Sequence, residues 1–189
     1  MSVIVDHKYI KDNLSAERIA LVGGAGFIGH NLATHLRQYG AEVMVMDNLM
    51  QNNMTANITD TDLDGFRREL NHGFLSQRFE RMRDAGVVMR NADARSTIDV
   101  TAALSEFEPT KIVHLAAISS AVEANKDPGQ CFDLQLLTLR NVLEYCRLTR
   151  NDVNQLVFMS SSTVYGNFKG SEVDENVRPR PYGIYASAK

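Results

Sequence analysis

The sequence VGGAGFIG, at Val22–Gly29, places three glycines at three-residue intervals between an apolar segment and a helical pattern. The apolar segment is Arg18–Val22, and the helical pattern covers Phe27–Tyr39. Glycines at a strand-to-helix turn let the backbone approach a pyrophosphate, and the helix N-terminus adds N–H groups and a positive dipole end. The stretch therefore predicts a dinucleotide-binding turn, although glycine clusters also occur in turns that bind nothing.

Further apolar segments alternate with longer helical patterns. We expect strands at Glu42–Met46, Val87–Met89, Lys111–Leu115 and Gln155–Met159, and helices at Thr97–Phe107 and Pro128–Thr149. This alternation is typical of a parallel sheet covered by helices on both faces. The sequence predicts an α/β fold, a doubly wound parallel sheet of the NAD(P)-binding Rossmann type. Residues 1–16 would form an N-terminal extension and residues 17–189 the dinucleotide-binding domain.

The region between the second and third expected strands is less regular. Gln51–Asn57 is expected to be a loop, and Leu63–Arg83 has helical spacing with many arginines. A solvent-exposed helix is the simplest interpretation of that pattern. Contact with a substrate or a partner subunit is the alternative.

Composition excludes several classes of protein. The chain has 189 residues, 44% hydrophobic content and a net charge of −3, which fit one globular domain and give no basic surface for nucleic acid. No apolar run approaches the ~20 residues that cross a bilayer, and the N-terminus lacks the pattern of a signal peptide. Cys131 and Cys146 lie in no metal or redox motif. We expect a cytoplasmic protein without a metal site.

Two carboxylates follow expected strands. Asp47 lies 18 residues after Gly29, close to the ~20 expected for an acid on the adenosine ribose. A carboxylate there accepts hydrogen bonds from ribose hydroxyls and repels a 2′-phosphate, which favours NAD over NADP; a simple strand-end turn is the alternative. Asp93 is a candidate for contact with the adenine edge or, alternatively, for capping the next helix.

The last residues contain a Tyr-x-x-x-Lys pair, Tyr185 and Lys189. Residues four apart share a helix face, and an ammonium group near a tyrosine favours the phenolate form, which acts as a base. The fifth strand runs into the hydroxyl-rich segment Ser160–Thr163, at the strand end where ligands bind in open parallel sheets. A surface helix pair and a serine-rich turn without chemistry are the alternatives.

Together these segments resemble the extended short-chain dehydrogenase/reductase superfamily, specifically its NAD-dependent epimerase/dehydratase family and the UDP-sugar 4-epimerases within it. The matching segments occur in the family's order: GGAGFIG at Gly23–Gly29, Asp47–Leu49, Val113–Ala117, Asp127-Pro128, SSSTVYG at Ser160–Gly166 and YASAK at Tyr185–Lys189.

The resemblance implies a role for each matching residue. Ser161, Tyr185 and Lys189 fall on the catalytic positions, and Ser119, Ser161 and Ser162 are expected near the substrate. His114 is expected to be a packed strand residue. The candidate cofactor-binding residues are Gly23, Gly26, Phe27, Ile28, Gly29, Asp47, Asn48, Asp93, Ala94, Leu115, Ala116, Ala117, Tyr185 and Lys189.

The sequence departs from the family pattern in three places. Val22 replaces a common threonine. Gln135, Thr138 and Leu139 stand where an asparagine and a Gly-Thr pair are usual. Ser162-Thr163 occupies the place of the Asp-Glu pair that 4,6-dehydratases use to eliminate water, which favours epimerisation.

The resemblance implies an NAD-dependent nucleotide-sugar epimerase that acts at carbon 4 through a 4-keto intermediate, with homodimerisation through flanking helices. A dehydratase or dehydrogenase of the same family is one alternative, and a non-catalytic NAD-binding sensor or interaction module is another. Relatives continue beyond the YxxxK lysine into a substrate domain. We therefore expect this chain to be a fragment that lacks it.

Overall fold

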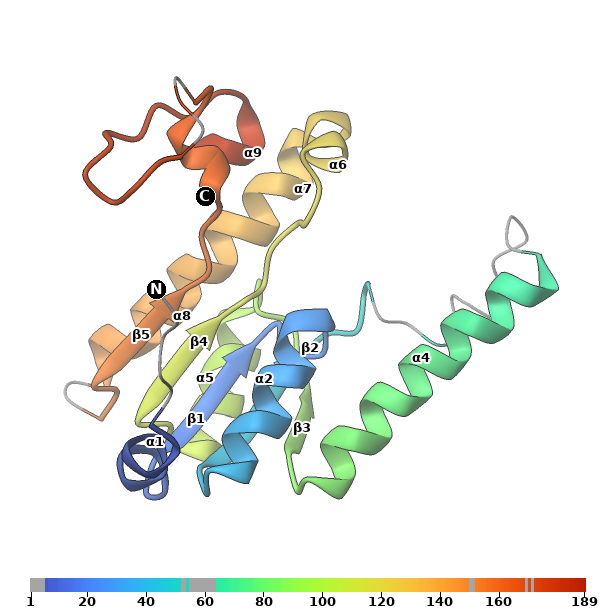
Figure 1. Cartoon of the computed structure of the whole chain (residues 1–189), viewed down its shortest axis with the longest axis vertical. Coiled ribbons are helices and arrows are strands. Elements are labelled where there is room, and N and C mark those ends of the chain that lie inside the picture. Colours follow the sequence, from blue (N-terminus) through green and yellow to red (C-terminus); the bar gives the residue numbers. More distant parts are fainter. Residues whose placement is uncertain (1–5, 52–53, 55–63, 150–151, 169, 171) are drawn as a thin grey trace.

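The computed structural model describes residues 6–51, 54, 64–149, 152–168, 170 and 172–189 (Figure 1). In this part of the chain, neighbouring strands are all parallel and form one sheet in the order β3-β2-β1-β4-β5. The strands are β1 (Arg18–Val22), β2 (Glu42–Asp47), β3 (Val88–Asn91), β4 (Lys111–His114) and β5 (Gln155–Phe158). The predicted doubly wound parallel sheet is confirmed.

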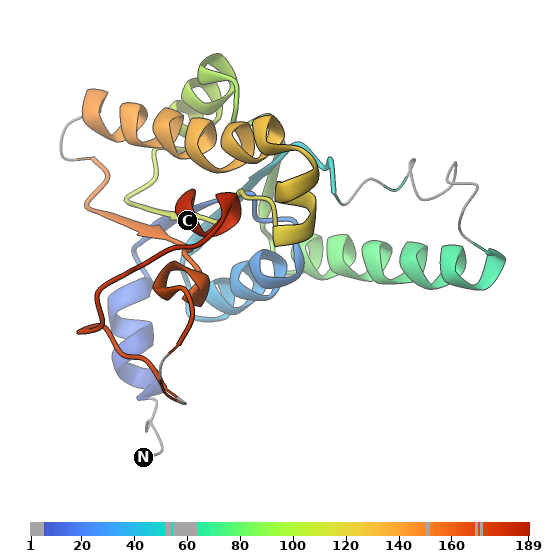
Figure 2. The same cartoon turned by 90° about the horizontal axis from the view of Figure 1, so that it is seen from above.

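Helices cover both faces of the sheet, which Figure 2 shows from above. The first face carries α2 (Phe27–Gln38) and α4 (Gly65–Asp84), and the second carries α5 (Thr97–Phe107) and α8 (Thr138–Leu148). Side chains alternate along each strand. In β1, Ile19 and Leu21 therefore join the core on the first face, while Ala20 and Val22 join the core on the second.

The helix ends follow from local sequence. Gly40 has a φ of 90°, a left-handed conformation that glycine adopts readily, just after the C-terminus of α2. Ser96 caps α5 and accepts a hydrogen bond from the Asp99 amide. A further helix, α1 (His7–Leu14), lies in the segment predicted only as an extension; Asp6 caps it and Leu14 packs against the core on the first face.

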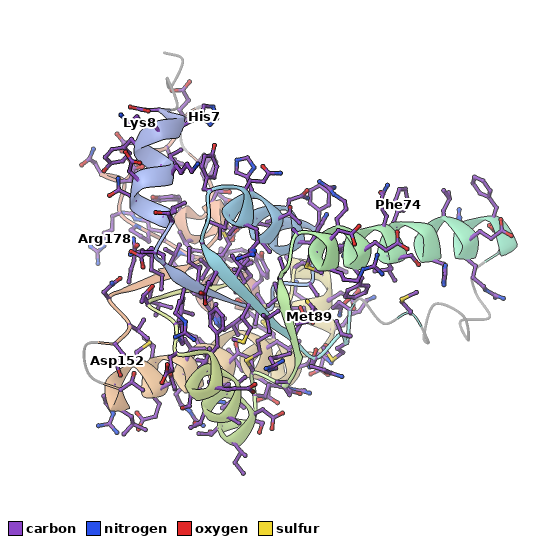
Figure 3. All side chains as sticks on the ribbon, turned by 90° about the horizontal axis from the view of Figure 1, so that it is seen from below. His7, Lys8, Phe74, Met89, Asp152 and Arg178 are labelled. Atoms are coloured by element: carbon purple, nitrogen blue, oxygen red, sulfur yellow. The ribbon has the colours of Figure 1, made fainter. Side chains whose placement is uncertain are left out.

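The region after β2 contains one long helix. α4 spans nearly all of the predicted helical segment, and its outer part extends beyond the sheet (Figure 1). This part exposes Phe66 and also Phe74, which is labelled in Figure 3. The expected loop at Gln51–Asn57 lies largely outside the described residues, as does Leu63. Within the described residues, no helix is long and apolar enough to span a membrane.

The helix predicted at Pro128–Thr149 is continuous but contains a π-helical turn. It comprises α7 (Pro128–Phe132), the π segment η1 (Asp133–Leu137) and α8, and the side chain of Asp127 caps its start. A π turn widens a helix by one residue and is frequent at functional sites. Here it lies beside the carboxyl ends of the strands (Figure 1).

Short elements pack above the strand ends. They are α6 (Ala121–Lys126), the 3-10 turn η2 (Ser162–Tyr165) and α9 (Ile184–Ser187). A small apolar cluster joins α9 to α6 and α7: Ile118, Ala124, Cys131, Leu134 and Ala188, with Ile184 and Tyr185 packed against it. This cluster fixes the position of the Tyr-x-x-x-Lys segment.

Candidate functional site

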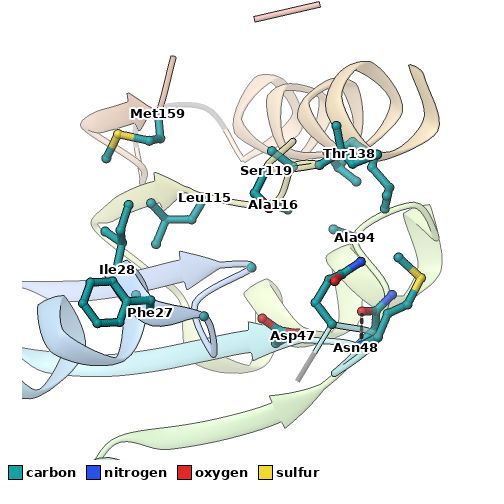
Figure 4. A pocket seen from close by; sticks show the side chains of 18 of the residues that line it. Phe27, Ile28, Asp47, Asn48, Ala94, Leu115, Ala116, Ser119, Thr138 and Met159 are labelled. Carbon is teal, nitrogen blue, oxygen red and sulfur yellow. Dashed lines mark hydrogen bonds between the residues drawn. The ribbon is translucent and has the colours of Figure 1, made fainter. Parts of the chain in front are cut away.

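A cleft of about 610 Å³ opens at the carboxyl ends of the strands. Chain order reverses between β1 and β4 in the sheet, and such a switch point is where open α/β sheets bind ligands. The cleft runs from Asp47 at the end of β2 past the glycine turn to Met159 beyond β5 (Figure 4).

The three glycines of the turn have three different surroundings. Gly23 has a φ of 77°, and a Cβ there would lie 2.4 Å from the Ala116 nitrogen. A Cβ on Gly29 would lie 2.2 Å from the Gly24 oxygen, so the helix packs directly on the turn. A Cβ on Gly26 would meet no atom within 4 Å, and this glycine lines the cleft. Gly26 therefore leaves space beside the N-terminus of α2, as a bound pyrophosphate requires.

Asp47 is bound to the glycine turn. Its carboxylate accepts hydrogen bonds from the Ala25 amide at 2.9 Å and from the Leu49 amide at 2.8 Å. It therefore forms the strand-end turn that was its alternative role and also lines the cleft. Because each carboxylate oxygen accepts more than one hydrogen bond, ribose hydroxyls still find acceptors there.

Asp93 lines the cleft beside Asn48 but is already paired. Its carboxylate accepts hydrogen bonds from the Arg95 guanidinium at 2.6 Å and from the Asn48 side chain at 3.2 Å. The Arg95 hydrogen bonds lower the pKa of Asp93 to about 2. The helix-capping alternative is wrong, because Ser96 caps α5.

The wall opposite the glycine turn comes from β4 and the long helix. The Leu115 and Ala116 amides donate to the Val22 oxygen at 2.8 and 2.9 Å, which holds the segment after β4 against the end of β1. Thr138 lines the cleft, and its hydroxyl is 3.2 Å from Nε2 of His114. The long helix thus places a buried threonine on this wall of the cleft.

His114 is fully buried and stacks on the Phe158 ring, as expected of a packed strand residue. Burial lowers its pKa to about 4, and the Lys189 charge acts in the same direction. The imidazole is therefore neutral at pH 7.

Tyr185 and Lys189 lie together at the end of the cleft beyond β5. Both line the cleft, and the Lys189 Nζ is 6.0 Å from the centre of the Tyr185 ring. The Lys189 Nζ also donates to the Met159 oxygen at 3.2 Å, and burial lowers the pKa of this lysine. Tyr182, the other tyrosine of this segment, is 86% exposed.

The segment Ser160–Thr163 contacts the same end of the cleft. It does so through Ser160, whereas the family motif indicates Ser161. Ser160 lines the cleft and donates to the Lys189 carbonyl oxygen at 2.9 Å. Ser161 is half-buried, and its hydroxyl oxygen accepts from the Thr163 hydroxyl at 2.9 Å. Ser161 and Ser162 are not among the residues that line the cleft.

The cleft brings together every residue named above as a cofactor-binding candidate, and Ser119 as well. The sequence reasoning missed several lining residues, of which Arg78 is charged and Thr138 is polar. Helical spacing alone left open which arginine of α4 faces the sheet. The other missed residues are Met50, Gln51, Ile118, Leu134 and Met159, whereas Ser160 belongs to the hydroxyl-rich segment that was expected at this strand end.

The fold and the cleft define a dinucleotide-binding protein of the doubly wound α/β class. The three glycines and Asp47 fit NAD, since they provide an open helix N-terminus and a carboxylate at the ribose position.

Comparison with known proteins narrows the class. The sequence profile of the NAD dependent epimerase/dehydratase family matches residues 19–189. The chain belongs to this NAD-dependent family.

Among curated relatives, the UDP-glucose 4-epimerase of Lacticaseibacillus casei is 29% identical over 87% of this chain and 42% of its own length. Two solved structures are also similar. The UDP-glucose 4-epimerase of Stenotrophomonas maltophila, with bound NAD and formylated UDP-arabinopyranose, has a TM-score of 0.73, 27% identity and coverage of 92% of this chain and 46% of that one. The NAD complex of the Thermus thermophilus UDP-glucose 4-epimerase has a TM-score of 0.69, 31% identity and coverage of 91% and 47%. The chain spans less than half the length of these relatives.

Proposed function

We propose that the chain is the cofactor-binding part of an NAD-dependent epimerase that acts at carbon 4 of a nucleotide-sugar, with UDP-sugars as the first candidates. One observation carries this proposal: the glycine turn, Asp47 and the Tyr185–Lys189 pair line the same cleft. The 4-epimerases among the relatives support the choice of reaction.

In this proposal Gly26 and the N-terminus of α2 hold the pyrophosphate, and Asp47 binds the adenosine ribose. NAD bound there would supply the hydride acceptor for carbon 4 of the sugar and, as NADH, the hydride donor for the opposite face of the resulting ketone. Tyr185, in its phenolate form, would take the proton of the sugar's 4-hydroxyl and later return it. Lys189 is proposed to place a positive charge beside Tyr185, since its Nζ lies 6.0 Å from the centre of the Tyr185 ring.

Ser161 is proposed to orient the reacting oxygen, with Ser119 and Ser162 nearby on the substrate side. Because its hydroxyl oxygen accepts hydrogen bonds from Thr163, its own proton is available to the sugar. Ser160 lines the cleft, and its hydroxyl would orient the reacting oxygen if Ser161 does not reach the cleft.

The organisation of the whole protein is also proposed. Residues 17–189 would form one dinucleotide-binding domain after an extension of residues 1–16, which agrees with a family match that begins at residue 19. A cytoplasmic homodimer is proposed from the family resemblance.

The test compares Tyr185→Phe with Tyr182→Phe, in protein expressed with any coding sequence that continues in frame beyond Lys189. NAD binding and the interconversion of UDP-glucose and UDP-galactose are measured. Tyr185→Phe should lower turnover by about 10²–10⁴-fold, the usual contribution of an acid–base group, while NAD still binds. Tyr182→Phe, at an exposed position, should change turnover by no more than about twofold.

Turnover by Tyr185→Phe at the wild-type rate would contradict the mechanism. NAD binding by the wild-type protein without turnover of any nucleotide-sugar would instead support the non-catalytic NAD-binding module.

A further inference from the structure

Arg78 differs from the other arginines of α4 in its surroundings. It lies on the inner part of the helix, is half-buried and lines the cleft. Arg67, Arg81 and Arg83 are exposed, and Arg68 is half-buried but does not line the cleft. Its Nη1 donates to the Ala25 oxygen at 3.1 Å. Arg78 therefore connects α4 to the glycine turn.

Ala25 links Arg78 to Asp47. The amide of Ala25 donates to the Asp47 carboxylate at 2.9 Å, and its carbonyl accepts from Arg78. Burial lowers the pKa of Arg78, and the nearby charge of Asp47 opposes that shift. The guanidinium and the carboxylate thus lie on the same wall of the cleft and attract each other.

Of the described residues that line the cleft, the cationic ones are Arg78 and Lys189. Lys189 lies beside Tyr185, and Arg78 is linked to Asp47 through the backbone of Ala25. In dinucleotide sites of this fold, the carboxylate after the second strand meets the adenosine ribose, and a nearby arginine accommodates a 2′-phosphate. This chain has both groups at that end.

We propose that Arg78 offsets the repulsion of Asp47 for a 2′-phosphate, so that the adenosine end of the cleft accepts NADP as a second, weaker cofactor beside NAD. Guanidinium groups bind phosphate oxygens with charge-assisted hydrogen bonds, and the two backbone N–H groups on Asp47 further disperse its charge. The inference rests on the NAD site proposed above and extends its ligand class.

The test is a binding titration of NAD and NADP against the wild-type protein, Arg78→Met and Arg67→Met. Arg78→Met keeps the apolar stem but removes the charge. Arg67→Met removes an equal charge eleven positions away, about 16 Å along the same helix. In the wild type, the Kd of NADP should exceed the Kd of NAD by no more than about a hundredfold.

Arg78→Met should weaken NADP binding at least about tenfold more than it weakens NAD binding, because only NADP carries the extra charge. Arg67→Met should change neither affinity. Increasing salt should weaken NADP binding more steeply in the wild type than in Arg78→Met. Asp47→Asn supplies a second variant and should move the affinity ratio towards NADP.

NAD binding without measurable NADP binding in the wild type would overturn the inference and leave the proposed function intact. An equal loss of affinity for NAD and NADP in Arg78→Met would also overturn it, since that result would mean that Arg78 only holds the glycine turn in place. Failure of the wild type to bind either cofactor would instead refute the proposed NAD site itself.

Discussion

Gly26→Ala should separate cofactor binding from folding. Gly26 has a φ of −72° and a ψ of −176°, which alanine adopts without strain, and an added Cβ meets no atom within 4 Å. Alanine gains about 0.4–1 kcal/mol by restricting the unfolded chain and loses a similar amount as a poorer N-cap of α2. We therefore expect the free energy of unfolding to change by less than about 1 kcal/mol, or about 2–4 °C in Tm.

The same Gly26→Ala substitution should weaken NAD binding. The new methyl group projects into the space that we assign to the pyrophosphate. Steric overpacking of a rigid site costs about 1–3 kcal/mol. At 1.4 kcal/mol for each factor of ten, NAD should bind about 5- to 150-fold more weakly.

Gly29→Ala is the matched comparison, three residues further along the same turn. Its Cβ would lie 2.2 Å from the Gly24 oxygen and 2.5 Å from the Gly24 Cα, so backbone must move. We expect a loss of about 3 kcal/mol, the upper part of the overpacking range, and a Tm lower by about 6–12 °C.

Thermal unfolding with and without NAD measures both effects. At an NAD concentration of about 100 times Kd, the wild type should gain about 2.7 kcal/mol, whereas a variant that binds a hundredfold more weakly gains about 0.4 kcal/mol. If Gly26→Ala binds NAD as tightly as the wild type, the pyrophosphate does not lie at Gly26 and the reasoning is refuted.

Three further outcomes follow from the site and the core. The pKa of His114 is about 4 in the folded protein, against an ordinary value of 6.5. Between these pH values the unfolded chain therefore binds more protons than the folded chain. The contribution of neutral His114 to the free energy of unfolding is complete above about pH 6.5 and falls by up to about 3 kcal/mol towards pH 4. Denaturant unfolding across that range checks this, and a His114→Asn variant with the same pH slope as the wild type would contradict it. Leu104→Ala, at a fully buried position in α5, should lower the free energy of unfolding by about 2–5 kcal/mol in urea denaturation. A loss below about 1 kcal/mol would contradict this and show that neighbouring side chains fill the cavity. Ser161→Ala should lower turnover by about 10²-fold with unchanged NAD affinity in steady-state and binding assays, and unchanged turnover would assign that role to another hydroxyl.

The fold was largely predictable from the sequence because local patterns and tertiary packing agree. The segments at Arg18–Val22 and Thr97–Phe107 coincide with β1 and α5, since buried parallel strands are apolar throughout and helices show regular apolar spacing. The strand predicted at Val87–Met89 lies instead at Val88–Asn91, because Val87 closes the turn after α4 by donating to the Met82 oxygen.

The π turn at Asp133–Leu137 could not be predicted, because the same residues also suit an ordinary helix. Tertiary contacts surround it. Gln135 and Thr138 are buried, and Thr138 lies beside His114 of β4. Spacing rules that assume 3.6 residues per turn do not detect such an insertion.

The site residues that come directly after a predicted strand, such as Gly26 and Asp47, could be predicted from the sequence. It was less predictable where distant segments meet. Arg78 reaches the cleft only because α4 packs beside α2, and Ser160 reaches it because the chain after β5 turns towards Lys189. These contacts join residues that sequence spacing does not relate.

The most direct test of the central claim is an electron-density map of the protein crystallised with NAD. We predict the pyrophosphate at Gly26 and the N-terminus of α2, the adenosine ribose at Asp47, and the nicotinamide end beside Tyr185 and Lys189. NAD bound away from this cleft, or with its nicotinamide end remote from Tyr185, would contradict the proposed site.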